Sequence, residues 1–245
     1  MTSLCVMSLV GLLFAQSLSR PSGLISEGPV LDLASGRIAV AADAHAVTGR
    51  SDPAAIGGVS AVWAAETSEK TGISLVAVSA YGGASLKAEH ESPTCRLGWT
   101  TLAGIGARET GHGTFEGAHL LSDGRTSRPI LGPALDGQGG FAAIRSTAES
   151  VAWHGDTRWD HAVGPLQFIP STWEKWQSDG DGDGVGDPHN FFDATYAAAR
   201  YLCAAGANMT TAAGWTRAVH SYNHSDTYVA GVLRRANTYA TLASP

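Results

Sequence analysis

The sequence predicts one mainly α-helical domain, and three observations lead to this prediction. With 245 residues, 44% hydrophobic content and 16% charged residues, the chain can bury a sizeable core. Its apolar residues recur at steps of three and four in several separate segments, which is the period of a helix with one buried face. Clusters of glycine, proline and serine separate these segments, as expected for the connections between helices.

The N-terminal third of the chain is expected to lie outside this domain. Residues 1–20 contain an uncharged apolar run of the length of a signal-peptide core, too short to cross a bilayer, although a buried helix is the alternative. Export predicts a secreted protein of the cell envelope, with no stable membrane insertion after the signal is removed. Residues 21–72 are rich in alanine, glycine and serine and predict a linker. The folded domain is expected to span residues 73–245.

Five segments are expected to form the main helices of the domain. They are Ile73 to Leu86, Trp99 to Glu109, Ala194 to Cys203, Trp215 to Tyr222 and Tyr228 to Leu242. A further short helix is predicted after Pro170, with Ser171 as its N-cap. The glycine-rich segment 114–150 shows no period, and a long irregular segment of this kind is typical of a functional loop, here interpreted as the wall of a cleft.

Glu109 closes one of the predicted helices and is the candidate for acid chemistry. The apolar stripe that begins at Trp99 places Glu109 on or beside the core face, and Gly111 and Gly113 supply the backbone conformations that end a helix. Apolar neighbours and the C-terminal end of the helix dipole both disfavour the carboxylate, so its pKa should be raised. A carboxylic acid of this kind can protonate a leaving oxygen, as in glycosidic cleavage. The alternative is an ordinary helix-end acid paired with Arg108 or a lysine.

Three polar residues later in the chain are candidates for ligand contacts. Gln167 lies between Leu166 and Phe168, where a buried amide must bond either to local backbone or to a polar ligand such as an acetamido group. Tyr222 and Asn223 follow at the end of a predicted helix, where a phenol can donate to a developing charge. Turn chemistry and a core tyrosine are the alternative for this pair.

An alternation of aspartate and glycine at residues 179–187 predicts a structural calcium site. The spacing brings the side chains of Asp179, Asp181 and Asp183 toward one hard cation, with the carbonyl of Val185 as a further ligand. Asn190 replaces the usual bidentate glutamate, and Asp193 can serve in its place if the loop is longer. An acidic surface turn without metal is the alternative, and no cofactor is expected for catalysis.

Once the signal is removed, Cys95 and Cys203 remain as a pair. An exported chain with an even pair predicts one disulfide, against the alternative of two buried free thiols. The formal net charge of −6 and the absence of any Lys and Arg cluster argue against a nucleic-acid partner. We expect a monomer.

Together, these segments resemble the lytic transglycosylases of the SLT, lysozyme-like superfamily, in particular the secreted actinobacterial branch similar to membrane-bound lytic transglycosylase B. The resemblance runs from about Ile73 to Ala240. It is carried, in order, by the segments 102–113 and 162–173, the aspartate-glycine loop, Tyr201-Leu202-Cys203 and Ser221-Tyr222-Asn223. It implies a goose-type, SLT-like helical fold with a glycine-rich cleft loop, and peptidoglycan glycan strands as the partner.

The resemblance also implies a reaction, in which the residue matching Glu109 is the acid and then the base. The β-1,4 bond between N-acetylmuramic acid and N-acetylglucosamine is cleaved, with formation of 1,6-anhydromuramic acid. Gln167, Tyr222 and Asn223 are then expected to line the sugar subsites, and Thr110 is expected to contact the substrate beside the acid. Thr110 stands where the family usually has serine, which keeps the hydroxyl and adds a methyl group.

Two alternatives to this reaction stay open at the level of sequence. A muramidase of the same fold would use water, with Asp123, Asp136 or Asp156 as a second carboxylate. A wall-binding module without catalytic activity is the other. His161 occupies a position where arginine is common in the family, which makes a salt bridge to Asp160 doubtful.

Overall fold

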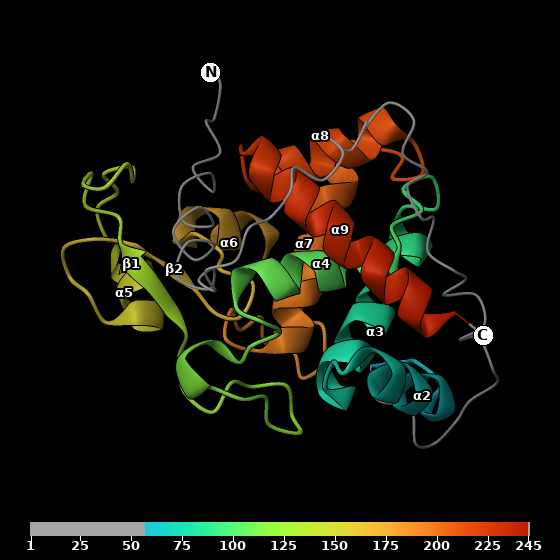
Figure 1. Ribbon diagram of the computed structural model, residues 1–245. Helices are drawn as coiled ribbons and strands as arrows, with labels where there is room; N and C mark the ends of the chain where they lie inside the picture. Colours follow the sequence, from blue (N-terminus) through green and yellow to red (C-terminus); the bar gives the residue numbers. More distant parts are fainter. Residues whose placement is uncertain (1–56, 245) are drawn as a thin grey trace, which may run out of the picture.

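The computed structural model describes residues 57–244, and within them the chain is mainly helical (Figure 1). The helices are α2 (Ala61–Thr71), α3 (Leu75–Glu91), α4 (Trp99–Glu109), α5 (Ala148–His154), α6 (Pro170–Trp176), α7 (Phe191–Gly206), α8 (Ala212–Tyr222) and α9 (Asp226–Ala243), with a short 3-10 turn at Phe115–Gly117. Strands β1 (Leu131–Ala134) and β2 (His161–Val163) pair antiparallel in one small sheet. The predicted mainly α fold is confirmed. The predicted signal peptide lies outside the described residues, and none of the helices described is long and apolar enough to cross a membrane.

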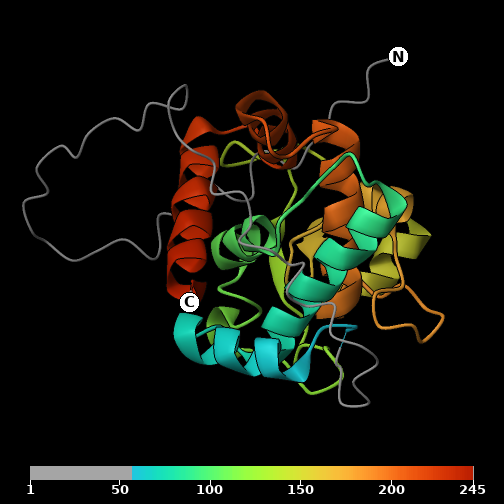
Figure 2. The ribbon, with the colours of Figure 1, turned by 90° about the vertical axis from the view of Figure 1, so that its right-hand side faces the viewer.

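Helix α4 is the inner helix of the domain, and two glycines allow its neighbours to approach it closely. Helix α9 runs beside α4, and α3 packs on it as well (Figure 2). A Cβ atom on Gly104 would lie 2.8 Å from the backbone oxygen of Val232 on α9, and one on Gly106 would lie 1.9 Å from the Tyr81 hydroxyl on α3. Larger residues at these two positions would push the flanking helices away. The predicted core stripe of α4 is therefore buried on more than one side.

Helix α7 forms the second layer of the core, between α3 and α8. Asn190 caps its first turn by accepting from the backbone N–H of Phe192. Near its end, Cys203 forms a disulfide with Cys95, which precedes α4, and the two Cα atoms are 5.3 Å apart. The predicted disulfide is confirmed. It joins the start of the α4 segment to the far end of α7.

Two details of the predicted architecture are corrected. Helix α2 lies inside the range 21–72, for which the sequence predicts a linker; it buries Ala64 and Thr67 and packs against α3 and α9. Its buried face is made of small residues, so it carries little hydrophobic signal. Helix α6 begins directly at Pro170 with Ile169 as its N-cap, so Ser171 lies inside the helix and does not cap it. Proline suits the first helical position because its missing N–H has no partner there.

A small lobe, residues 131–163, stands to one side of the helices and consists of β1, α5 and β2 (Figure 1). The lobe includes the second part of the glycine-rich segment 114–150. Much of that segment is irregular, as predicted, but β1 lies within it, and α5 begins at its end with a capping box between Thr147 and Ser150. Gly164 follows β2 with a left-handed φ of 73°, and a Cβ there would lie 1.8 Å from the backbone oxygen of Pro188. Only glycine lets the chain after the lobe pass so close to the aspartate-glycine loop.

Candidate active site

Glu109 lies in the last turn of α4 and is buried, with 4% of its surface exposed. Gly111 and Gly113 follow with φ angles of 60° and 79°, so the chain leaves the helix in the predicted left-handed conformation. Within the described part of the chain, Glu109 makes no ion pair with Arg108 or with any lysine. The alternative of an ordinary paired helix-end acid is therefore not supported.

Burial raises the pKa of Glu109 from 4.5 to about 7. Two effects oppose this rise: a hydrogen bond from Tyr228 and the positive charge of Arg108 both lower the pKa. Desolvation is the larger effect, because a carboxylate loses its hydration entirely inside the protein. A substantial fraction of the Glu109 side chain is therefore protonated at neutral pH, as the sequence predicts.

Tyr228 on α9 is the immediate partner of the acid, and the sequence did not identify it. Its hydroxyl donates to Oε1 of Glu109 over 2.5 Å, and both side chains are buried. Burial, followed by the nearby Glu109, raises the pKa of Tyr228 well above 10, so the phenol remains a donor. With Oε1 accepting this bond, the acidic proton of Glu109 belongs on Oε2. Tyr228 thus selects the oxygen that carries the proton.

The chain after Glu109 is held in place by Thr110 and His112. The Thr110 hydroxyl donates to the carbonyl of Pro165 over 2.7 Å and accepts from the N–H of Gly113. His112 lies between two phenols, with Nδ1 2.8 Å from Tyr81 and Nε2 2.9 Å from Tyr239. Burial, and then the charge of Arg235, lowers the pKa of His112 to about 4, so its ring is neutral. Thr110 acts here on the backbone, and its methyl group is accommodated without disturbing either bond.

The turn at residues 164–167 gathers three of the predicted site residues. Thr110 donates to Pro165, the Tyr222 hydroxyl donates to the carbonyl of Leu166 over 2.8 Å, and Gln167 Nε2 donates to the carbonyl of Gly164 over 2.8 Å. The hydroxyl proton of Tyr222 is therefore used within the protein. This residue positions the turn, and in this conformation its phenol does not donate to a ligand.

Two buried amide oxygens near this turn have no hydrogen-bond partner. They are Oε1 of Gln167, whose backbone has a left-handed φ of 52°, and Oδ1 of Asn223 at the end of α8. Both residues are almost completely buried. A buried acceptor without a partner is costly, and a strained backbone is typical of a functional position. Each of these two oxygens therefore has an unused capacity to accept a hydrogen bond.

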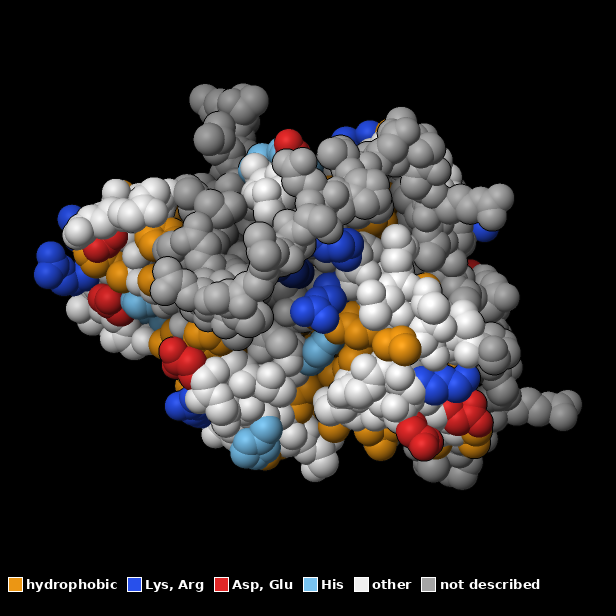
Figure 3. All heavy atoms as spheres, in the orientation of Figure 1, with side chains coloured by type: hydrophobic (Ala, Val, Ile, Leu, Met, Phe, Trp, Pro, Cys, Tyr) orange, Lys and Arg blue, Asp and Glu red, His pale blue; other side chains and the backbone are white. Residues whose placement is uncertain are grey.

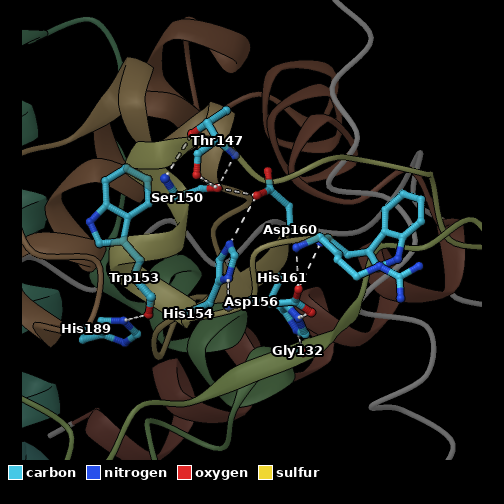
Figure 4. A network of polar contacts seen from close by, with 11 residues as sticks. Gly132, Thr147, Ser150, Trp153, His154, Asp156, Asp160, His161 and His189 are labelled. Carbon is cyan, nitrogen blue, oxygen red and sulfur yellow. Dashed lines mark hydrogen bonds and ion pairs between the residues drawn. The ribbon is translucent and has the colours of Figure 1, made fainter.

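A polar network holds the small lobe together (Figure 4). Asp160 Oδ1 accepts from the Ser150 hydroxyl over 2.6 Å and from His154 Nε2 over 3.2 Å. His161 does not pair with Asp160: its Nδ1 donates to the Gly132 carbonyl, and its Nε2 lies 3.2 Å from Asp156 Oδ2. The sequence makes a salt bridge between Asp160 and His161 doubtful, and the structure shows that these two residues do not pair. The buried Asp160 thus has a structural role between α5 and β2.

The three candidates for a second catalytic carboxylate are bound to other groups. Asp123 pairs with the exposed Arg125, and Asp136 bonds to the backbone and side chain of Gln138. Bonds from backbone N–H groups lower the pKa of Asp123, and bonds from the backbone and from His161 lower that of Asp156 to about 2. Carboxylates with lowered pKa values are weak proton acceptors, so neither is suited to activating water.

Three of the predicted metal ligands come together where the aspartate-glycine loop meets the start of α7. Oxygen atoms of Asp179, Asp181 and Asp193 all lie within 4.8 Å of one another. Asp183 is not part of this group; its Oδ1 caps the loop by accepting from the N–H of Val185, whose side chain is exposed. Asp193, buried at the start of α7, accepts from backbone N–H groups of the loop, including that of Gly180. The sequence offers Asn190 and Asp193 for the last ligand position. Of these two residues, Asp193 is the one whose carboxylate lies with Asp179 and Asp181.

Comparison with known proteins adds one finding. Residues 149–231 match the family model of the transglycosylase SLT domain. This match supports the SLT, lysozyme-like superfamily. The mainly helical structure agrees with the fold of that superfamily, and the match indicates an enzyme of the transglycosylase class that acts on peptidoglycan. The matched segment contains Gln167, Asn223 and Tyr228. It begins at residue 149, so it does not include Glu109. No curated protein and no solved structure matches the chain.

Proposed function

We propose that this protein is an exported lytic transglycosylase that cleaves the β-1,4 bond between N-acetylmuramic acid and N-acetylglucosamine. The observation that carries the proposal is the buried Glu109, whose pKa of about 7 and bond from Tyr228 suit it to act first as an acid and then as a base. The family match at residues 149–231 supports the class of reaction and the substrate.

In the proposed reaction, Glu109 Oε2 donates its proton to the glycosidic oxygen as the bond from that oxygen to C1 of the muramyl residue breaks. The carboxylate that remains accepts the proton of the C6 hydroxyl of the same sugar, and the C6 oxygen forms the new bond to C1. Glu109 is protonated again at the end, and no water is consumed. The bond from Tyr228 is stronger to a carboxylate than to an acid, so it stabilises Glu109 midway through the cycle.

This reaction needs one carboxyl group, whereas hydrolysis normally needs two. Asp123, Asp136 and Asp156, the other acids considered, each bond to neighbouring groups, and lowered pKa values weaken Asp123 and Asp156 as bases. The unpaired oxygens of Gln167 and Asn223 are assigned to the acetamido N–H groups or hydroxyls of the bound sugars. The single-acid reaction is therefore favoured over that of a muramidase.

The test is mass spectrometry of the products from purified peptidoglycan, with wild type and Glu109→Gln in parallel. We expect disaccharide products one water lighter than reducing muropeptides from wild type, and none from the variant. Reducing ends would establish a hydrolase instead. Cleavage by Glu109→Gln at a rate near that of wild type would remove Glu109 from the mechanism, and sugar binding without product from wild type would leave a wall-binding module.

We also propose a structural calcium ion in the aspartate-glycine loop. Asp179, Asp181 and Asp193 fit such an ion, because Ca²⁺ binds several carboxylate oxygens in a flexible coordination geometry. Burial, and also the charge of Asp181, raises the pKa of Asp193 to about 6, and a cation would relieve both effects. The chain just after the loop contacts the lobe, since His189 Nε2 donates to the carbonyl of Trp153 (Figure 4). A bound ion would hold these elements in place, without a part in the chemistry.

The calcium site is tested by following thermal unfolding during a calcium titration. We expect a rise in the melting temperature of wild type and no rise for Asp181→Ala. The matched control is Asp183→Ala, which removes a neighbouring acid that is outside the group of three. An unchanged melting temperature for wild type, or an equal loss of the shift in both variants, would count against the assigned ligands.

A further inference from the structure

A basic pocket lies between the end of α4 and the middle of α9. Its volume is about 300 Å³, and it is lined by Arg108, Gly231, Arg234, Arg235 and Thr238. The four residues from α9 are spaced three, four and seven positions from the first, so they form one face of that helix. Of the residues that the structure describes, no Asp or Glu lines this pocket or pairs with its three arginines.

Arg108 is held in the pocket by packing, and its Nε atom is buried with no hydrogen-bond partner. The side chain lies against Gly231, where a Cβ atom would be 3.1 Å from Nε and 3.3 Å from both Cδ and Cζ. Its Cζ is 6.0 Å from the ring centre of Tyr228, the partner of Glu109. The charge of this guanidinium has no carboxylate partner among the described residues, so an anion in the pocket would be attracted to it.

The pocket is positive although the chain as a whole carries a net charge of −6. In the space-filling view, Lys and Arg side chains gather in the middle of the face that α9 crosses (Figure 3). Three guanidinium groups around one hollow attract anions, and arginine in particular matches the planar fork of a carboxylate. The ligand that fits this chemistry is a small carboxylate group.

We propose that this pocket binds a carboxylate of the peptide carried by the muramic acid residue that is cleaved. The inference rests on the proposed function, because it is that function which places a muramyl sugar beside Glu109. Arg108 is adjacent to Glu109 in the chain, and it lies beside the ring of Tyr228, the phenol that donates to Glu109. The peptide is attached to the same sugar as the reacting C1 and C6 atoms. The carboxylates of the peptide would therefore lie near the bond that is cleaved.

The kinetic test compares peptide-bearing glycan strands with the same strands freed of peptide by an amidase. The test variant is the double substitution Arg234→Gln and Arg235→Gln, which leaves Arg108 next to the acid. The control, Arg158→Gln with Lys175→Gln, removes two charges from exposed positions elsewhere. On peptide-bearing strands, we expect the test variant to raise KM about tenfold with kcat unchanged, and the control to have no effect. On peptide-free strands, both should match wild type. An equal change on both substrates, or no change, would overturn the proposal.

A binding test separates this proposal from the proposed function, since it needs no cleavage. The free peptide released by the amidase and inorganic phosphate are each titrated calorimetrically into wild type and the double variant. We expect wild type to bind the peptide about tenfold more tightly than the double variant does, and to bind phosphate more weakly than the peptide. Phosphate binding as tight as that of the peptide, or no peptide binding, would overturn the assignment. Peptide binding without cleavage of any strand would overturn the proposed function alone.

Discussion

Replacing Glu109 by glutamine should change the stability of the protein in a way that depends on pH. The folded state raises the pKa of this carboxyl group from 4.5 to about 7 because it is buried. Between these two values the native state binds more protons than the unfolded state, so stability falls as pH rises through this range. Each unit of pKa is worth about 1.4 kcal/mol, so the full penalty above pH 7 is about 3 kcal/mol.

Glutamine resembles the protonated acid in shape and never ionises, so it avoids this penalty. We therefore expect Glu109→Gln to have nearly the stability of wild type at pH 4.5 and to be more stable by about 3 kcal/mol at pH 8.5. For a domain of this size, that gain corresponds to roughly 6–12 °C in melting temperature. The effect is opposite to that of most substitutions at buried polar positions, which destabilise the fold.

The assay is urea unfolding of both proteins at several pH values from 4 to 9, with Glu174→Gln as the control. Glu174 lies on the exposed side of α6, so its removal should leave the difference from wild type constant over this range. A flat difference for Glu109→Gln as well would refute the argument that burial controls this carboxyl group. Because this measurement needs no substrate, it tests the acid independently of the reaction.

Two further predictions concern the partner of the acid and the disulfide. Tyr228→Phe removes the hydrogen bond that lowers the pKa of Glu109, so the alkaline fall of kcat/KM should move to higher pH by about one unit. The control Tyr222→Phe, which removes a bond to a backbone carbonyl, should leave the pH of this fall unchanged. A shift to lower pH for Tyr228→Phe would contradict the assigned hydrogen bond. Removing the bridge between Cys95 and Cys203, which are 108 positions apart, should lower stability by up to about 5 kcal/mol. A urea midpoint that is unchanged by a reducing agent would contradict this.

The sequence points to Glu109 as the candidate acid but not to the group that bonds to it. Glu109 could be found because a local period places it on the buried face of α4 and two glycines end that helix. Tyr228 comes from α9, 119 positions later, and joins the site only through packing of α9 on α4. In the sequence it is one more aromatic residue in an amphipathic helix. A buried tyrosine hydroxyl usually has a hydrogen-bond partner, but the sequence does not show which residue that partner is.

A similar limit applies to the aspartate-glycine loop and to Tyr222. Alternation of aspartate and glycine predicts a turn that gathers carboxylates, and two of its aspartates do gather, together with Asp193 from α7. Which three depends on the start of α7, whose first turn brings Asp193 under the loop while Asp183 is used as a cap. The Tyr222 hydroxyl likewise bonds to a backbone carbonyl of a distant turn. Local patterns predict the residue types at a site, whereas long-range packing decides how each one is used.

The position of Arg108 links the proposed peptide pocket to the acid. Burial raises the pKa of Glu109, and the charge of Arg108 is one of the two effects that limit the rise. A carboxylate bound in the pocket would offset this charge, so the pKa of Glu109 should be higher in the complex than in the free enzyme. By linkage, protonation of Glu109 should strengthen binding of the peptide by the same factor. On peptide-bearing strands, the alkaline fall of kcat, which reports the complex, should therefore lie at higher pH than that of kcat/KM, which reports the free enzyme. On peptide-free strands this difference should shrink. If it were equally large on both substrates, the pocket and the acid would act independently, and Arg108 would serve the fold alone.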